Sequence, residues 1–359
     1  MDLVESGYES VRPLFAGLAE THLNVTAVLD GDCPGQVYAD DLGEPRAALV
    51  VSGDGCYLAG DTDNQAFNAA LNAFLPRDTY FVLFCDLEAW RPALDAVLQH
   101  TYAVRAGRRY YTFRQPRIPD WPERIPEGFA VQPVDAALLA RGLQHGDAVQ
   151  EGILGTWRTL ELFLQRGFGF CLVHGGDIAS WSLCDFASGS RCEIGISTAG
   201  DYRRRGLGTL AAAATAAHAA AQGFRTIGWH CWANNVGSIG VAEKVGFVRA
   251  ADYEVYINHW AAENVTDMTP DEFRAFAEAY ERWFQAEPPT GGYPHLVAAT
   301  AWAMARVRGL CFQQLHRAVD VGWLRSVAQL REAWPEFFMN PQREQQEEWK
   351  TLRARLEND

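Results

Sequence analysis

The chain has 359 residues, of which 48% are hydrophobic and 21% are charged, and its formal net charge is −14. This composition excludes a disordered or collagen-like chain, and the length fits two or three domains of roughly 150 residues each. The acidic balance argues against general binding to nucleic acid, which needs a positive field. It suits a cationic small molecule, and it is equally typical of an ordinary cytosolic protein.

The N-terminal residues and the cysteines bear on location. The stretch 1–6 is acidic where a signal peptide would be basic, and the longest apolar stretch, 210–221, is too short to cross a bilayer. The eight cysteines are scattered and form no C-x-x-C pair, so we expect neither a metal site nor a disulfide framework. The sequence therefore predicts a cytoplasmic protein that does not contact a membrane.

The first segment, 1–119, alternates strand and helix signals. The expected elements are an amphipathic stretch at 11–23, strands at 36–40, 46–51 and 56–59, a helix at 64–75, a strand at 80–84, a helix at 88–99 and a strand at 108–113. This order indicates an α/β or α+β fold. Prolines at 116, 119, 122 and 126 then disfavour both helix and central strand, which predicts a domain boundary.

The second segment, 126–260, repeats this order although the two sequences share little. The expected elements are a strand at 129–132, helices at 136–144 and 156–166, a hairpin at 168–184, a strand at 191–196, a helix at 207–222, a strand at 225–232, a helix at 238–245 and strands at 247–257. The sequence thus predicts two similarly ordered α/β domains in tandem.

The third segment, 265–359, carries helix signals only. Helices are expected at 270–286, 295–307, 310–321 and 341–356. Residues 301–323 resemble one tetratricopeptide-type helical hairpin, and a plain helical cap is an equal alternative. We expect this all-helical domain to dock on the second domain or on a protein partner.

A glycine-rich loop between a strand and a helix is the most informative stretch. Glycines at 206 and 208 let the backbone approach an anion, and the helix that begins there favours negative charge. Residues 206–211 also fit the dinucleotide pattern G-x-G-x-x-A, but the next strand, 229–232, ends without the required acid. No Gly-Lys-Ser/Thr follows, so the loop is not a P-loop.

A second cluster lies near the end of the next strand. Asn235 and Ser238 are placed to hydrogen-bond a ligand, and they are equally the expected caps of the following helix. Together, R-x-x-G-x-G (Arg203, Gly206 and Gly208) and the downstream N-x-x-S-x-x-x-A-x-K-x-G-F resemble the GNAT N-acetyltransferase superfamily. Residues 191–196, 202–206 and 227–232 resemble the branch that contains the zwittermicin A resistance acetyltransferase.

The resemblance implies two GNAT-like mixed-sheet domains in tandem, with the all-helical domain after them. The first segment resembles a degenerate GNAT half without R-x-x-G-x-G, so we do not expect it to bind coenzyme A. The second would bind acetyl-CoA as cosubstrate, with the pyrophosphate on the loop and the pantetheine along the strand. The residues so implied are Ile194, Ile196, Ser197, Thr198, Arg203, Arg204, Arg205, Gly206, Leu207, Gly208, Thr209, Asn235 and Ser238.

Acetyl transfer needs an oxyanion donor and a proton acceptor. The strand-edge amide of Ile196 is the candidate donor, and Glu193 is the candidate base, unless it is a surface residue or an ion-pair partner of Arg191. The family's tyrosine, seven residues after the asparagine, is replaced by Ala242. Tyr253 and Cys231 are the candidates that protonate the leaving thiolate, unless the thiolate leaves without help.

Other residues have a structural and a functional interpretation. His230 is a ligand or base, or a hydrogen-bonded core residue. Trp181, Trp229 and Trp232 are either core residues or part of a substrate pocket. Asp147, Glu151 and Asp185 are candidate anchors for a cationic acceptor.

The leading hypothesis is an acetyl-CoA-dependent N-acetyltransferase that acts on a small primary amine by direct attack. The branch resemblance makes antibiotic resistance one version of it. The alternatives are a non-catalytic acyl-CoA sensor, and a protein-directed acetyltransferase that binds its partner through the C-terminal helices.

Overall fold

The computed structural model describes residues 1–77, 79–101, 103–258, 269–286, 288–289, 291–334 and 346–357. They form two compact units. The first comprises Met1–Asn72, Val82–Val97 and Arg105–Tyr256, and the second comprises Ala73–Phe81, Leu98–Val104 and Ile257–Asp359. The predicted mixed α/β fold and helical C-terminal region are confirmed. Of the helices in the described ranges, none combines the length and the apolar character that a membrane span requires.

Each half of the α/β region contributes six strands. The first half contains β1 (Asp2–Leu3), η1 (Arg12–Phe15), α1 (Ala16–Thr21), α2 (Leu23–Leu29), β2 (Gly35–Ala39), β3 (Ala47–Ser52), β4 (Cys56–Gly60), α3 (Gln65–Phe74), β5 (Phe81–Phe84), α4 (Leu87–Val97) and β6 (Val104–Phe113). The second contains η2 (Trp121–Arg124), β7 (Phe129–Pro133), α5 (Ala136–Leu139), α6 (Gly146–Thr156), α7 (Leu160–Arg166), β8 (Gly169–His174), β9 (Asp177–Ser188), β10 (Arg191–Thr198), η3 (Gly200–Tyr202), α8 (Leu207–Ala221), β11 (Thr226–Trp232), α9 (Val236–Val245) and β12 (Phe247–Asn258).

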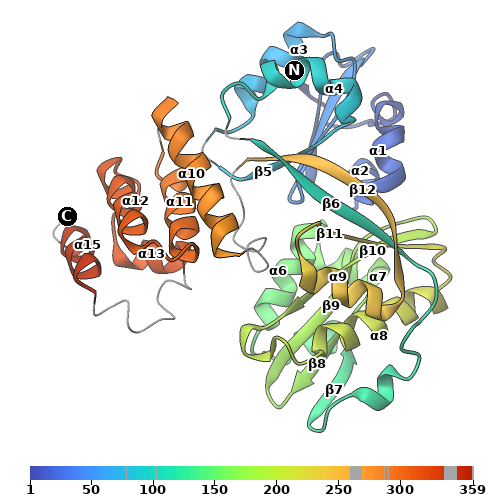
Figure 1. Cartoon of the computed structure of the whole chain (residues 1–359). Helices are drawn as coiled ribbons and strands as arrows, with labels where there is room; N and C mark the ends of the chain where they lie inside the picture. The colour runs from blue at the N-terminus through green and yellow to red at the C-terminus, as the bar shows by residue number, and fades with distance from the viewer. Residues whose placement is uncertain are drawn as a thin grey trace. The chain divides into compact units, whose positions relative to one another are not determined.

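The twelve strands of the described residues join one sheet in the order β1-β2-β3-β4-β5-β12-β6-β11-β10-β9-β8-β7. The two halves are arranged symmetrically in this sheet. β1 to β5 follow one another inward from one edge, β7 to β11 follow one another inward from the other edge, and β12 and β6 lie at the centre. The last strand of each half lies beside the other half, and Figure 1 shows β6 and β12 running side by side. β6 pairs antiparallel with β11, from Gly228↔Thr112 to Trp232↔Arg108. The two halves therefore interlock, and the domain limits expected from the sequence stay a prediction.

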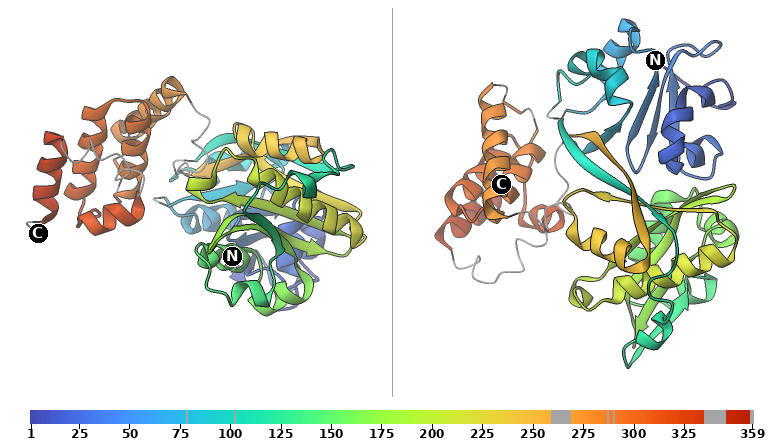
Figure 2. Two further views of the ribbon diagram at one scale, coloured as in Figure 1. Left: turned by 90° about the horizontal axis from the view of Figure 1, so that it is seen from below. Right: turned by 45° about the vertical axis from the view of Figure 1, so that its right-hand side comes forward.

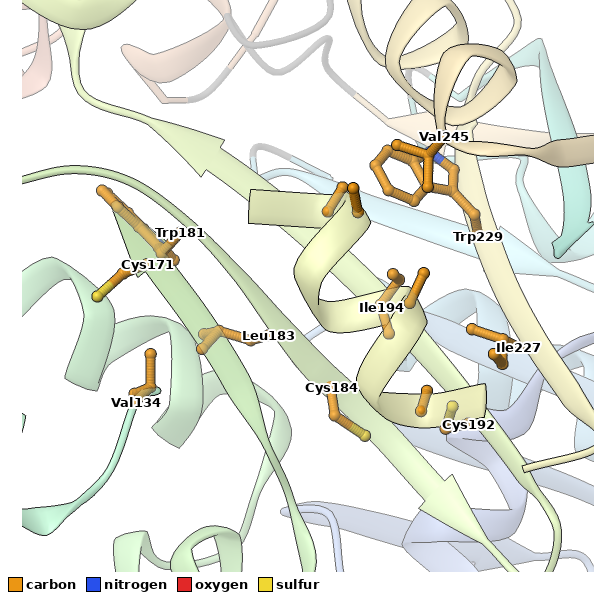
Figure 3. Packing of buried hydrophobic residues seen from close by; sticks show 14 of the residues in the cluster. Val134, Cys171, Trp181, Leu183, Cys184, Cys192, Ile194, Ile227, Trp229 and Val245 are labelled. Carbon is orange, nitrogen blue, oxygen red and sulfur yellow. The ribbon is translucent and has the colours of Figure 1, made fainter. Parts of the chain in front are cut away.

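An alanine-rich helix forms the centre of the second half. α8 buries six alanines, whose small side chains let the helix lie close to β9 and β10. Cys184, Cys192, Ile194 and Ile227 belong to the same buried cluster, and Figure 3 shows them gathered around α8. The opposite face of β10 carries Glu193 and Gly195, because successive side chains on a strand alternate between faces.

The sequence analysis missed two helices of the α/β region, α2, which follows the amphipathic stretch expected at 11–23, and α6. It expected helices at 136–144 and 156–166, but α5 ends at Leu139 and α6 occupies Gly146–Thr156. α6 contains Gly146, Gly152 and Gly155, and glycine in a helix interior costs about 1 kcal/mol relative to alanine. Burial of Val149 and Ile153 offsets that cost through tertiary packing, which local propensity cannot show.

The second unit is built around helices α10 (Pro270–Ala286), α11 (Tyr293–Met304), α12 (Arg308–Asp320), α13 (Val327–Ala333) and α15 (Glu347–Glu357). α13 was not expected from the sequence, and residues 341–345 of the last expected helix lie outside the described residues. Figure 2 shows the orange and red helices side by side, and α11 packs between α10 and α12. A partly buried polar network joins them, in which Glu281 accepts hydrogen bonds from Trp302 and Gln314 and pairs with Arg317.

Candidate functional site

β10 and β11 separate part-way along their length. They pair in parallel only from Arg191↔Thr226 to Glu193↔Gly228. Beyond Glu193, β10 continues to Thr198 with pairs to β9 alone, and β11 continues with pairs to β6. The edge of Ile194–Thr198 that faces β11 is therefore not paired with a strand. Its peptide groups can hydrogen-bond an extended ligand, apart from the Thr198 carbonyl oxygen, which accepts from the Arg203 Nε. Ile194, Ile196, Ser197 and Thr198 all lie on this segment.

The loop that follows β10 presents backbone N–H groups at the start of α8. Arg204 and Gly206 have φ of 63° and 80°, in the left-handed region. Within the described part of the chain, no acceptor is found for the backbone N–H groups of residues 204–208, whereas those of Thr209 and Leu210 reach the Gly206 carbonyl oxygen. Consecutive free amides at a helix N-terminus form an anion-binding arrangement.

The three arginines of this loop are exposed and differ in their contacts. The Arg203 Nε donates to the Thr198 carbonyl oxygen at 3.3 Å, and the Arg205 guanidinium lies 5.3 Å from the ring centre of Phe129. We find no such side-chain contact for Arg204 among the described residues. The loop therefore adds positive charge beside the free amides in an otherwise acidic protein.

Small residues bring the start of α8 close to β10. A side chain at Gly208 would place its Cβ 3.1 Å from the Thr198 Oγ1. That hydroxyl is held by the Ser180 Oγ at 2.9 Å, and the Ser180 Oγ also donates to the Ser197 carbonyl oxygen at 2.8 Å. Glycine at 208 therefore sets the distance between the free strand edge and the helix N-terminus.

Asn235 and Ser238 take part in contacts within the protein. The Asn235 Oδ1 accepts from the Ser238 backbone N–H at 2.8 Å, so Asn235 caps α9. The Ser238 Oγ accepts from the Trp229 Nε1 at 3.0 Å. Ala242 is fully buried on the same helix and packs in the core. The capping interpretation thus describes Asn235 in this structure, and ligand contacts by either residue stay a prediction.

Glu193 is buried on the face of β10 opposite α8, with its side chain 9% exposed. Its Oε1 accepts from the backbone N–H of Leu23, the first residue of α2, at 2.9 Å. No described residue hydrogen-bonds its Oε2. Arg191 does not pair with Glu193 and instead donates to the carbonyl oxygens of Ala19 and Glu20, in the last turn of α1. One carboxylate oxygen is thus fixed and the other is available.

His230 connects Glu193 with Tyr253. The His230 Nε2 lies 3.1 Å from the Thr21 carbonyl oxygen and 3.5 Å from the Glu193 Oε1. The His230 Nδ1 lies 2.8 Å from the Tyr253 Oη. Burial raises the pKa of the Tyr253 phenol above its ordinary value of 10.0. The structure thus brings the two predicted catalytic residues, Glu193 and Tyr253, to either side of one histidine.

Asp185 lies next to Glu193 because of a β-bulge. Glu193 is opposite Phe186 and Ile194 is opposite Cys184, so Asp185 is the extra residue of β9. A Cβ at Gly195 would lie 2.3 Å from the Asp185 Oδ2, which places this carboxylate on the Glu193 face of β10. Burial, with the nearby charges of Glu193 and Asp54, raises the pKa of Asp185 well above 3.8. The described residues provide it no hydrogen bond or ion pair.

The other candidate anchors are less closely placed. Asp147 and Glu151 are exposed, one turn apart on α6, and no described contact joins them to Glu193. Trp181 and Trp229 are core residues, as the structural interpretation expected. Trp232 is also buried, and its ring centre lies 4.7 Å from the guanidinium carbon of Arg108. Asp185 is therefore the candidate anchor that the fold brings to Glu193.

Comparison with known families and proteins identifies the family of this chain. The profile of the GNAT acetyltransferase family matches residues 12–256, which is more than half of the chain. The chain belongs to the GNAT acetyltransferase family. It is 26% identical over 260 residues to an uncharacterised N-acetyltransferase, YdfB, from Bacillus subtilis (strain 168), which covers 71% of this chain and 97% of that protein.

A solved structure shows the same fold. The GCN5-related N-acetyltransferase-like protein from Streptococcus suis 89/1591 superposes with a TM-score of 0.54 and 22% identity, covering 68% of this chain and 96% of that chain. The GNAT family match spans both halves of the interlocked sheet. GNAT enzymes transfer acetyl groups from acetyl-CoA, so the chain is an N-acetyltransferase by family.

Sequence reasoning missed the contribution of the first half to this site. Thr21 and Leu23 approach His230 and Glu193 through backbone atoms, and backbone groups leave no residue-type signal in a sequence. The amphipathic stretch expected at 11–23 runs across His22, where the structure ends α1 and begins α2. His22 itself is 7% exposed and stacks on His230 with ring centres 5.3 Å apart.

Proposed function

We propose that the protein transfers an acetyl group from acetyl-CoA to a primary amine of a small molecule by direct attack. The observation that carries this proposal is the placement of Glu193. It lies where β10 and β11 separate, one carboxylate oxygen is held by Leu23, and the other has no described partner. A fixed carboxylate with an available oxygen beside an open strand edge suits proton removal from an amine.

The loop after β10 supports a role in holding the cosubstrate. Free amides from residues 204–208, exposed arginines and the α8 N-terminus together suit a pyrophosphate. The unpaired edge of Ile194–Thr198 suits the amides of a pantetheine arm, and the Ile196 N–H is the proposed oxyanion donor. Thr209, Leu207, Asn235 and Ser238 complete the proposed contacts.

The proposed reaction forms the N–C bond and breaks the C–S bond of the thioester. The amine proton passes to the Glu193 Oε2, directly or through a water, and the departing thiolate accepts a proton. Tyr253 stays the candidate donor for that last step. No covalent acyl-enzyme is invoked, because all eight cysteines are buried, and burial raises the thiol pKa to about 12 at Cys56 and Cys171.

Asp185 supports a cationic acceptor. Two neighbouring carboxylates in a buried place repel each other unless one is protonated or a cation lies between them. An acceptor with a second cationic group would supply that charge, so we propose Asp185 as its anchor. An amine-bearing antibiotic is one such acceptor, in line with the resistance branch that the sequence resembles.

The test is release of free coenzyme A thiol by the purified full chain with a panel of mono- and diamines, amine-bearing antibiotics included. The proposal expects turnover with at least one amine, better with a second cationic group than with a monoamine of equal length. Absence of turnover with bound acetyl-CoA would contradict it and favour the acyl-CoA sensor, the reading that Ala242 in the tyrosine position permits. Turnover only on polypeptides would favour the protein-directed alternative and a role for the helical second unit in partner binding.

A further inference from the structure

We infer that His230 is a positioning residue through which the first half of the chain holds the general base. The inference rests on the proposed function, since it assumes that Glu193 takes the amine proton. It gives the half that lacks the R-x-x-G-x-G motif a part in catalysis without any contact with coenzyme A.

The tautomer of His230 follows from its partners. The Thr21 carbonyl oxygen only accepts hydrogen bonds, so the proton of the neutral ring resides on Nε2, 3.1 Å away. The Nδ1 therefore accepts from the Tyr253 hydroxyl at 2.8 Å. The Tyr253 phenol thus fixes which ring nitrogen faces the base, and Thr21 fixes the direction of its N–H.

The same N–H lies beside the Glu193 Oε1, at 3.5 Å from the Nε2. This carboxylate oxygen accepts from the Leu23 N–H at 2.9 Å. The Leu23 N–H is the hydrogen-bond donor to this oxygen, and the His230 Nε2, bound to the Thr21 carbonyl oxygen, holds the neighbouring backbone beside it, so the Oε2 stays turned to the open side. Thr21 and Leu23 flank the α1–α2 junction, and both groups that hold the base therefore depend on this junction.

Packed rings keep His230 in this orientation. Tyr110 of β6 stacks on the imidazole with ring centres 4.5 Å apart, and His22 also stacks on it with ring centres 5.3 Å apart. The side chain of His230 is 12% exposed. Tyr110 and His22 belong to the first half, so three of the neighbours that define the ring position, with Thr21, come from that half.

A positioning role predicts a specific kinetic pattern. His230→Ala removes the ring that holds Thr21 next to Leu23 and the Glu193 Oε1, and it should lower kcat about tenfold, with an unchanged KM for acetyl-CoA. His230→Gln should recover much of that loss, because its amide N–H reaches the same region as the Nε2 proton. Tyr253→Phe should lower kcat by at least about threefold, since it removes both the Nδ1 donor of the imidazole and the proposed proton donor to the thiolate, and Tyr256→Phe on the same strand is the matched control.

The decisive experiment is a double-mutant cycle on the full chain with the best amine, measured as thiol release. We expect His230→Ala to have almost no effect once Glu193→Gln is present, because the histidine acts through that carboxylate. Equal fold-losses from His230→Ala in both backgrounds, or an unchanged kcat in the single variant, would overturn the inference. Circular dichroism and acetyl-CoA affinity of each variant separate loss of folding from loss of positioning.

This outcome is distinguishable from failure of the proposed function. If the wild type releases no thiol with any amine, the proposed function is wrong. If Glu193→Gln leaves turnover unchanged, acetyl transfer stands, but Glu193 is not the base and the inference about His230 is wrong with it. If Glu193→Gln abolishes turnover while His230→Ala does not lower kcat, the proposed function stands and only the role of His230 is wrong.

Discussion

The two halves of the sheet contain the same strand–helix junction with opposite chemistry. In the second half, β10 leads through three exposed arginines to α8, and the amides of residues 204–208 have no described acceptor. In the first half, β4 leads through Asp61 and Asp63 to α3. There the Asn64 Oδ1 accepts from the Phe67 N–H at 3.0 Å, and Arg46 pairs with Asp61.

The difference shows that topology alone does not produce an anion site. The first junction already uses its own side chains to satisfy the helix N-terminus, and its carboxylates oppose a second anion. The second junction leaves the amides free and surrounds them with cations. The first half instead contributes the α1–α2 junction that contacts Glu193 and His230.

The largest expected effect is a difference in kcat between removing a carboxylate of the second half and removing one of the first half. Glu193→Gln keeps an oxygen for the Leu23 N–H and removes the proton acceptor, so kcat should fall about 10²- to 10⁴-fold. Asp63→Asn, at the first junction, should leave kcat unchanged. Steady-state thiol release measures both, and a loss of equal size in the two variants would contradict the assignment.

The next effect concerns Asp185, whose side chain should lower the free energy of unfolding and strengthen acceptor binding. Its pKa is raised in the folded state, so the folded protein retains a proton that the unfolded chain loses above pH 3.8. Stability is therefore lost as pH rises from there through the folded-state pKa. Asp185→Asn should raise the free energy of unfolding at pH 7 by about 1 kcal/mol and lower kcat/KM for dicationic amines about tenfold.

Urea unfolding at pH 7 and amine kinetics check this pair of effects. Gly195→Ala provides a second test, because the added methyl group has no room beside the Asp185 carboxylate. A variant at 185 that is less stable and equally active on diamines would show that Asp185 has a structural role instead.

Much of this comparison was predictable from the sequence, and part was not. The R-x-x-G-x-G loop, the tandem order of elements and Glu193 are local features that a single segment encodes. The exchange of β6 and β12 is not local, since it depends on which strand edges meet. The Asp185 bulge and the backbone contacts of Thr21 and Leu23 likewise arise only after the halves interlock.

A smaller effect tests the buried histidine at the α1–α2 junction. Burial, with the charges of His230 and Arg108, lowers the pKa of His22 well below 6.5. The unfolded chain therefore binds a proton below pH 6.5 that the folded protein does not, and stability is lost as pH falls below that value, by up to about 1.4 kcal/mol per pH unit.

His22→Phe should reduce this slope between pH 6.5 and 5.5 while keeping the ring contacts with Tyr57 and Phe84. Urea midpoints across this range measure the slope. His295 and His316 in the second unit also have lowered pKa values, so a residual slope is expected in the variant. An unchanged slope would contradict the burial of a neutral His22.

The smallest effect concerns backbone strain in the arginine loop. Arg204 has a φ of 63°, which costs a non-glycine residue on the order of 1 kcal/mol. Arg204→Gly should therefore change the unfolding free energy by less than about 1 kcal/mol, in the stabilising direction. Arg205→Gly, at a neighbouring position without positive φ, should be destabilising, and thermal unfolding compares the two.

The central claim is that the second junction, and not the first, binds acetyl-CoA. The direct measurement is calorimetric titration of acetyl-CoA into the wild type, Thr209→Glu and the equally sized Thr209→Gln. A glutamate in the first turn of α8 favours the helix and repels a pyrophosphate, so the variant stays folded. We predict micromolar binding by the wild type and Thr209→Gln, and at least about tenfold weaker binding by Thr209→Glu. Equal affinity in all three proteins, or no binding by the wild type, would contradict the account.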